Sequence, residues 1–227
     1  KPVRRAVDLG CATGELTREL HRLVEAGETL GIDNSSAMIE KSRPFAGNGV
    51  TIELGDIASF MPERPFDLVF SNAAIHWVPD HPALLARLTR AVAPGGQLAV
   101  QVPANHDHPA HRAAAEVAGE EPFRSALSGE VHPCHVLPPE AYAALLVQVG
   151  YAEPRVRLQV YVHRLPTRDA VVDWVRGTLL THYQSRLSEV DFARFVERYR
   201  ERLAEVLPDT APFVFTFKRI LFWGRRT

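Results

Sequence analysis

Short apolar runs alternate along this chain with segments whose apolar residues recur every three or four positions. The runs have the length of buried strands, and the spaced pattern between them is typical of amphipathic helices. Strands are predicted at residues 7–9, 30–33, 50–54, 65–72, 97–102, 155–163 and 213–223. Helices are predicted after the first glycine turn, around 37–40, over 82–93 and over 138–149, with two more between 167 and 207. Strands that alternate with helices form parallel sheets through right-handed crossovers, so the pattern predicts an α/β fold.

A glycine turn follows the first strand. Residues 7–9 lead into Gly10, and Gly14 precedes the helix that begins at Glu15. Glycine allows positive φ angles and close backbone approach, and the amides at a helix start attract an anion. A dinucleotide-binding turn needs a glycine at the position of Ala12, so the spacing favours a cofactor that presents a carboxylate. The D-x-G-x-x-x-G spacing resembles the first motif of class I S-adenosylmethionine-dependent methyltransferases.

Polar side chains follow the next three strands at the edge where parallel sheets bind ligands. Asp33 is placed to accept both ribose hydroxyls, although Asp33, Asn34 and Ser35 are also candidate N-caps of the following helix. Asp56 suits the adenine amino group and Ile57 the face of the ring, while the fourth strand delivers Asn72. The predicted cofactor-binding residues are Gly10, Cys11, Gly14, Asp33, Asn34, Met38, Asp56, Ile57, Asn72 and Trp77.

Four further segments carry a closer resemblance. They read N-A-A-I-H-W-V-P-D-H-P at 72–82, L-A-V-Q-V-P at 98–103, D-A-V-V-D-W-V-R-G-T at 169–178 and F-T-F-K-R-I-L-F at 215–222. These segments are similar to the trans-aconitate 2-methyltransferase family, and the resemblance spans essentially the whole chain. It implies methyl transfer from S-adenosylmethionine to a carboxylate of a small tricarboxylic acid, with S-adenosylhomocysteine as product. The chain departs from that family at Ala12 and Thr13 and at His76, where glutamine is frequent.

The resemblance also implies the architecture. We expect a Rossmann-like class I methyltransferase fold, with a seven-stranded, mostly parallel sheet, helices on both faces, an antiparallel last strand and a helical cap. Residues 1–227 are interpreted as a single methyltransferase domain. Its core comprises 1–103, 138–163 and 212–225, and its cap and insertions comprise about 104–137 and 167–207. We expect the cap to lie over the carboxyl edge of the sheet, and a further segment to precede residue 1.

Methyl transfer of this kind needs alignment of nucleophile, methyl carbon and sulfur rather than a covalent intermediate. A carboxylate is ionised at neutral pH and needs no general base, but its acid groups need cationic or hydroxyl partners. The predicted acceptor-positioning residues are His76, Arg176, Tyr183 and Arg219. One alternative is a class I methyltransferase for a phenol or an amine, with His76 as a base. Others are a Rossmann-type protein that binds the cofactor without turnover, or a module that binds NAD.

Composition adds limits to these interpretations. The formal charge of −1 gives no polyanion-binding surface, so nucleic acid is not an expected partner. No apolar run approaches the length of a membrane span, and two cysteines are too few for a disulfide framework, so we expect a protein of the reducing cytoplasm. His132, Cys134 and His135 cannot all reach one ion without an unusual loop, so no metal site is predicted.

Overall fold

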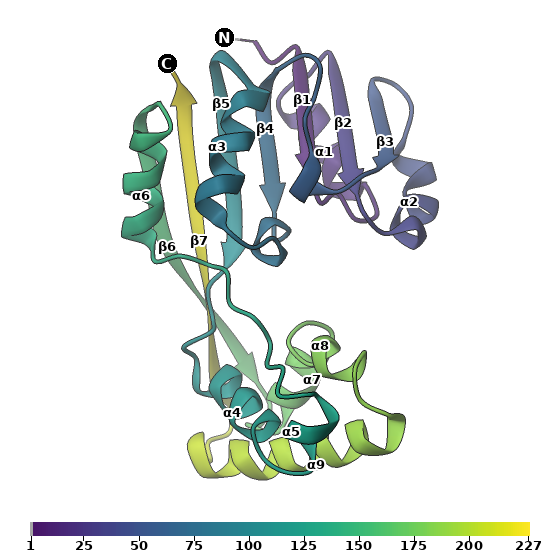
Figure 1. The fold of residues 1–227 in the computed structure, drawn as a ribbon, viewed down its shortest axis with the longest axis vertical. Helices are drawn as coiled ribbons and strands as arrows, with labels where there is room; N and C mark the ends of the chain where they lie inside the picture. Colours follow the sequence, from purple (N-terminus) through teal and green to yellow (C-terminus); the bar gives the residue numbers. More distant parts are fainter. Residues whose placement is uncertain (1) are drawn as a thin grey trace. The chain divides into compact units, whose positions relative to one another are not determined.

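The computed structural model describes residues 2–227. Within that range seven strands form one sheet with the order β3-β2-β1-β4-β5-β7-β6 (Figure 1). The strands are β1 (Arg5–Leu9), β2 (Glu28–Asp33), β3 (Val50–Leu54), β4 (Phe66–Asn72), β5 (Val92–Pro103), β6 (Tyr151–Leu165) and β7 (Phe213–Arg226). The helices are α1 (Glu15–Leu23), α2 (Ser36–Ser42), α3 (His81–Ala91), α4 (Pro109–Ala118), α5 (Phe123–Ala126), α6 (Pro139–Gln148), α7 (Ala170–Arg176), α8 (Thr181–Gln184) and α9 (Glu189–Val206).

The first five strands are parallel to their neighbours, and β7 is antiparallel to β5. The strands β1 and β4 are buried almost throughout, because helices cover both faces of the sheet there. This topology confirms the predicted α/β, Rossmann-like fold with an antiparallel last strand. It also brings the carboxyl ends of β1, β2, β3 and β4 to one edge of the sheet.

Helices cover the two faces of the sheet separately. Leu20 of α1 packs with Ala6 of β1 and Leu68 of β4 on one face. On the other face α3 and α6 are joined by a hydrogen bond of 2.5 Å between Nδ1 of His81 and the hydroxyl of Tyr142.

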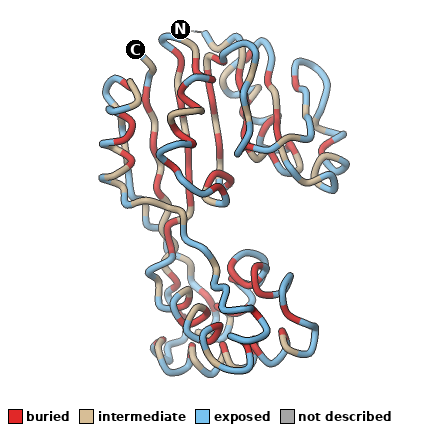
Figure 2. Tube along the Cα trace, viewed as in Figure 1, coloured by how far each residue is buried: buried red, intermediate tan, exposed pale blue. Residues whose placement is uncertain are grey.

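The chain separates into two compact units, each with its own buried residues (Figure 2). Unit 1 contains residues 1–103, 135–159 and 219–227, and thus most of the sheet. Unit 2 contains residues 104–134 and 160–218. The interpretation of the whole chain as one domain with a cap stays a prediction.

Unit 2 is built from five helices and the adjoining parts of β6 and β7. Its core is one apolar cluster that includes Phe195 and Phe215, both fully buried. Arg198 of α9 donates to Glu120 beyond the end of α4, and the hydroxyl of Tyr199 donates to the carbonyl of Ala110, so α4 and α9 are fixed side by side.

The segment 167–207 contains three helices, α7, α8 and α9, where two were predicted. The first interruption is at Gly177, the residue that caps the end of α7. The amide of Leu180 then bonds back to the carbonyl of Val175, and α8 begins at Thr181 after this turn. The sequence analysis did not predict this break, because a short turn can leave the regular spacing of apolar residues intact.

Candidate active site

The glycine turn after β1 is held close to the loop after β4. Gly10 has a φ of 84° and Gly14 a φ of 76°, both in the region that favours glycine. A Cβ atom built on Gly10 would lie 2.0 Å from the Cβ of Ala74 and 3.5 Å from Cδ1 of Ile57. The turn, the loop after β4 and the loop after β3 therefore meet at one point, and no side chain fits at position 10.

The amides of Gly10, Cys11 and Gly14 are bonded within the protein, so the anion site stays predicted at the helix start that follows. The amides of Gly10 and Cys11 both donate to the carbonyl of Ile32, at 2.7 and 3.0 Å, and the amide of Gly14 donates to Cys11. The side chain of Cys11 is buried, and its role in cofactor binding stays a prediction. The amides that remain for an anion are those at the start of α1, where Gly14 provides no side-chain cap.

Asp33 is fixed at the end of β2 by two backbone amides. Its Oδ2 accepts from Ala12 at 2.9 Å and its Oδ1 from Ser35 at 2.9 Å. The N-cap of α2 is Ser35, whose hydroxyl accepts from the amide of Met38. Each carboxylate oxygen has two acceptor directions, so Asp33 keeps capacity for a ligand diol while it ties the glycine turn to β2.

Asp56 caps the short 3₁₀ turn η2 (Ile57–Ser59) in the same way. Its Oδ1 accepts from the amide of Ala58 at 2.8 Å, which leaves Oδ2 for a ligand donor. Ile57 is buried beside Gly10. Asn34 is exposed and Met38 is half-buried at the start of α2, on the chain that leaves Asp33. These positions agree with the predicted cofactor-binding set, whose roles stay predictions.

Asp8, the acid of the D-x-G-x-x-x-G motif, is a buried residue next to this site, and the sequence analysis gave it no role of its own. Only 1% of it is exposed, and its Oδ2 accepts from the hydroxyl of Thr17 at 2.6 Å. Burial, with a further contribution from the charge of Asp33, raises the pKa of Asp8 to about 6 despite this hydrogen bond. The signal that could have found it is an acid inside the apolar run that immediately precedes the glycine turn.

Asn72 is the last residue of β4, and the loop after it carries His76 and Trp77. His76 and Trp77 lie in the 3₁₀ turn η3 (Ile75–Trp77), with ring centroids 4.7 Å apart, and Trp77 is 52% exposed. His81 holds this turn in place, because its Nε2 lies 3.1 Å from the carbonyl oxygen of Ile75. Burial lowers the pKa of His81, so the ring is neutral and its two nitrogens serve as one donor and one acceptor.

Arg219 lies at the start of the unit 1 part of β7, beside β5. Its Nη1 donates to Oε1 of Gln101 at 3.4 Å, and β7 pairs Arg219 with Pro103. Gln101 in turn pairs with Asn72 of β4. Arg219 is therefore at the same sheet edge as Asn72, and its role in acceptor binding stays a prediction.

Tyr183 has a different environment from the one predicted. It is fully buried in the core of unit 2, and its ring stacks on Phe195 with centroids 4.7 Å apart. Its hydroxyl accepts from the amide of His132 at 3.4 Å. The apolar face of α8 buries this side chain, so the expectation that it reaches an acceptor is corrected: Tyr183 is a core residue.

Arg176 is at the end of α7 on the surface of unit 2. Its side chain is 48% exposed and lies 3.7 Å from Asp173. With residues of α9 such as Phe192 and Val196 it lines a depression of about 650 Å³. Its role in acceptor binding stays a prediction. Among residues 2–227 no three His, Cys, Asp or Glu side chains are grouped as metal ligands.

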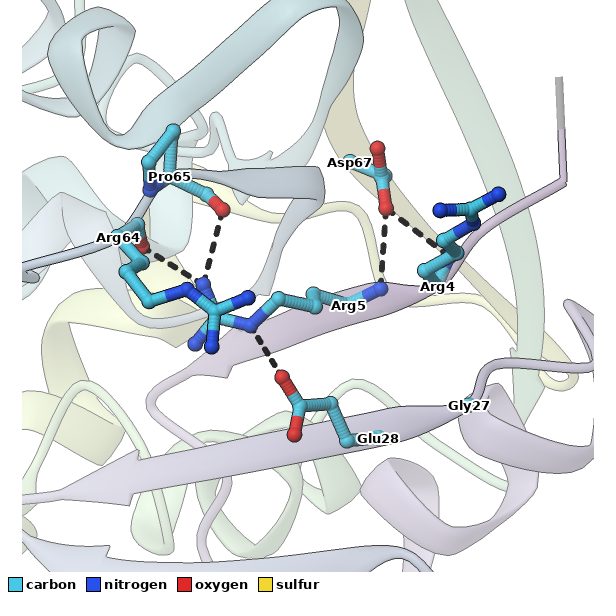
Figure 3. A pocket seen from close by; sticks show the side chains of 7 residues that line it. All are labelled: Arg4, Arg5, Gly27, Glu28, Arg64, Pro65 and Asp67. Atoms are coloured by element: carbon cyan, nitrogen blue, oxygen red, sulfur yellow. Dashed lines mark hydrogen bonds and ion pairs between the residues drawn. The ribbon is translucent and has the colours of Figure 1, made fainter.

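A second hollow, of about 490 Å³, lies at the opposite edge of the sheet (Figure 3). Asp67 accepts there from the amides of Arg4 and Arg5, and the Arg5 guanidinium pairs with Glu28 and donates to the carbonyls of Arg64 and Pro65. These contacts join the amino ends of β1, β2 and β4. Parallel sheets bind ligands at the other edge, so this hollow is a structural junction.

Comparison with known proteins points to one enzyme class. The family described as "Methyltransferase domain" matches residues 2–133. The trans-aconitate 2-methyltransferase of Deinococcus radiodurans is 41% identical over 232 residues, which cover 100% of this chain and 88% of that protein. The trans-aconitate 2-methyltransferase of Methylobacterium nodulans is 39% identical over 226 residues, which cover 98% and 87%.

Solved structures agree in fold at low identity. The YcgJ protein from Bacillus subtilis superposes with a TM-score of 0.65 at 16% identity, over 100% of this chain and 93% of that chain. The phosphoethanolamine N-methyltransferase 2 of Haemonchus contortus, in complex with S-adenosyl-L-methionine, gives a TM-score of 0.56 at 17% identity, over 100% and 49%. Within residues 2–227 no helix is both long enough and apolar enough to cross a bilayer.

Proposed function

We propose that this chain, which belongs to the trans-aconitate 2-methyltransferase family of S-adenosylmethionine-dependent methyltransferases, methylates a carboxylate of a small polycarboxylic acid such as trans-aconitate. The observation that carries the proposal is the sheet edge of unit 1. There the glycine turn, Asp33 and Asp56 meet the loop that carries His76.

The residues at this edge fit S-adenosylmethionine. Position 10 has no room for a side chain because Ala74 occupies that space, so the glycine turn is held directly against the loop after β4. Asp33 is held by two amides and keeps acceptor capacity for a ribose diol, and Asp56 keeps one oxygen for an adenine amino group. The uncapped start of α1 suits the carboxylate of an amino-acid tail. When bound, S-adenosylmethionine supplies an electrophilic methyl group on a sulfonium.

This chain then has to bind and orient the acceptor. A carboxylate is ionised at neutral pH, so no residue has to remove a proton from it. Arg219 supplies a fixed cation at the edge of the sheet, and His76 and Trp77 form an aromatic pair beside Asn72. Their part is to hold the reacting oxygen in line with the methyl carbon and the sulfur, because alignment supplies most of the rate enhancement in such transfers.

The proposal places the reaction in a reducing cytoplasm, since two cysteines are too few for a disulfide framework. Its direct partner is the small acid itself.

The test is a set of initial rates with S-adenosylmethionine and a panel of acceptors. The panel contains trans-aconitate, other di- and tricarboxylic acids, a phenol and an amine. We expect turnover with the polycarboxylic acids. Turnover with the phenol or the amine alone would overturn the proposal in favour of another small-molecule methyltransferase. Tight binding of S-adenosylhomocysteine with no turnover of any acceptor would indicate a protein that only binds the cofactor, and binding of NAD instead would indicate a dinucleotide module.

A further inference from the structure

Gln101 is a buried amide at the carboxyl end of β5, and the predicted site did not include it. Only 8% of the residue is exposed. It pairs in parallel register with Asn72 of β4, and its carbonyl accepts from the amide of Ala73 at 2.9 Å. Because paired residues of adjacent strands project from the same face, Asn72 and Gln101 form a short polar row at the ligand-binding edge of unit 1.

The neighbouring arginine fixes which way the amide of Gln101 points. Arg219 carries only donors, so the atom that faces its Nη1 at 3.4 Å has to be the oxygen Oε1. The amide nitrogen Nε2 is then the atom of this side chain that Arg219 does not bond. It is buried and has no hydrogen-bond partner within residues 2–227. A buried donor that stays without an acceptor costs about 1–3 kcal/mol, so such a group in a site is expected to meet a ligand oxygen.

We propose that Gln101 binds a carboxylate of the acceptor through Nε2 and, with the guanidinium of Arg219, forms the anchor for a carboxylate that does not react. This inference rests on the proposed function and deepens it. Donors that stabilise the charge of a carboxylate also weaken its oxygen as a nucleophile, so a carboxylate bound by both groups is a poor site of methylation. The acceptor therefore needs a second carboxylate, which explains a preference for polycarboxylic acids over monocarboxylic ones.

The informative variant is Gln101→Glu. It preserves the size of the side chain and the contact with Arg219, but it replaces the donor with a negative charge that repels the acceptor. We expect the KM for trans-aconitate to rise about 10- to 100-fold, as for loss of a hydrogen bond to a charged group. The affinity for S-adenosylhomocysteine, measured by calorimetry, is expected to stay within about twofold, which shows an intact fold and cofactor site.

Gln97→Glu is the matched control. Gln97 is on the same strand and the same face, four residues earlier and thus about 13 Å away. Its Oε1 accepts from Nε1 of Trp223 at 2.8 Å, and a glutamate keeps that acceptor. The substitution introduces the same charge on the same face of β5 but about 13 Å from Gln101, so we expect no change in the KM for trans-aconitate.

A monocarboxylic analogue, crotonate, separates anchoring from a general loss of activity. The wild-type enzyme is expected to use trans-aconitate with a higher kcat/KM than crotonate, and Gln101→Glu is expected to reduce that ratio at least about tenfold. An unchanged KM in Gln101→Glu, or an equal loss for both acids, would overturn the inference while wild-type turnover leaves the proposed function intact. If the wild-type enzyme turns over no carboxylic acid, the proposed function fails, and this inference fails with it.

Discussion

The variant Asp33→Ala tests whether Asp33 binds the cofactor, and Asp67→Ala at the opposite edge of the same sheet is its control. The carboxylate of Asp33 accepts two backbone amides, from Ala12 and Ser35. Asp67 does the same at the opposite edge, where it accepts from Arg4 and Arg5 at 2.9 and 3.1 Å. Both alanine variants leave two amides without a carboxylate, so both lose a similar amount of stability, about 2–4 kcal/mol.

Only Asp33 is placed to bind a ribose diol. Loss of two charge-assisted hydrogen bonds corresponds to about 2–4 kcal/mol, or roughly a 30- to 1,000-fold rise in the Kd for S-adenosylhomocysteine. The Kd is measured by calorimetry, and chemical denaturation gives the free energy of unfolding of each variant. We expect both variants to be destabilised and only Asp33→Ala to lose affinity. An unchanged Kd in Asp33→Ala, or an equal rise in Asp67→Ala, would refute the assignment.

Two further predictions follow from other parts of the structure, and a third tests a residue that only the sequence analysis assigned to the acceptor. Gly10→Ala should cost at least about 3 kcal/mol of stability, because the added methyl group clashes with Ala74 at a residue with a positive φ. Gly95 has a φ of 72° and no atom within 4 Å of a built Cβ, so the control Gly95→Ala should cost only about 1 kcal/mol. Equal decreases in the Tm of the two variants would contradict this prediction. The folded-state pKa of Asp8, about 6, is above its ordinary value of 3.8, so its ionisation destabilises the fold as pH rises from about 4 to about 6. The free energy of unfolding of Asp8→Asn should therefore rise by up to about 3 kcal/mol relative to that of the wild type between pH 4 and pH 7.5. A difference between the two proteins that does not change with pH would show that Asp8 is not the group responsible. Arg176→Ala should raise the acceptor KM about tenfold and leave the Kd for S-adenosylhomocysteine unchanged, and an unaltered KM would remove Arg176 from the site.

The fold could be predicted because the signals that define it are local. Each buried strand is an apolar run, and the turn between Gly10 and Gly14 interrupts the pattern at the point where the chain leaves β1 for α1. Asp33 and Asp56 could be placed for the same reason. Both directly follow strands, and parallel strands bring their carboxyl ends to one edge.

The details that the sequence did not show depend on contacts between distant residues. The amides of Gly10 and Cys11 are bonded to Ile32, more than twenty residues away, and no spacing rule reveals that partner. Tyr183 was predicted to position the acceptor, but its ring stacks on Phe195 in the core of unit 2, twelve residues later in the chain.

Gln101 is a candidate site residue that the sequence analysis did not identify. In the sequence it is a polar residue in a mostly apolar strand, and such a residue can be either solvent-exposed or part of a binding site. Its meaning comes from Arg219, 118 residues later, because only that contact fixes the direction of the amide. Asp8 belongs to the D-x-G-x-x-x-G motif, but the sequence did not show its burial, because its hydrogen-bond partner Thr17 is on the following helix.

The bond that forms in the reaction tests the central claim most directly. The protein is incubated with trans-aconitate and S-adenosylmethionine that carries a ¹³C-labelled methyl group, and the product is examined by carbon NMR. The account predicts a single labelled methyl ester and one equivalent of S-adenosylhomocysteine. Label on a carbon or nitrogen atom, or cofactor consumption that leaves trans-aconitate unlabelled, would contradict it.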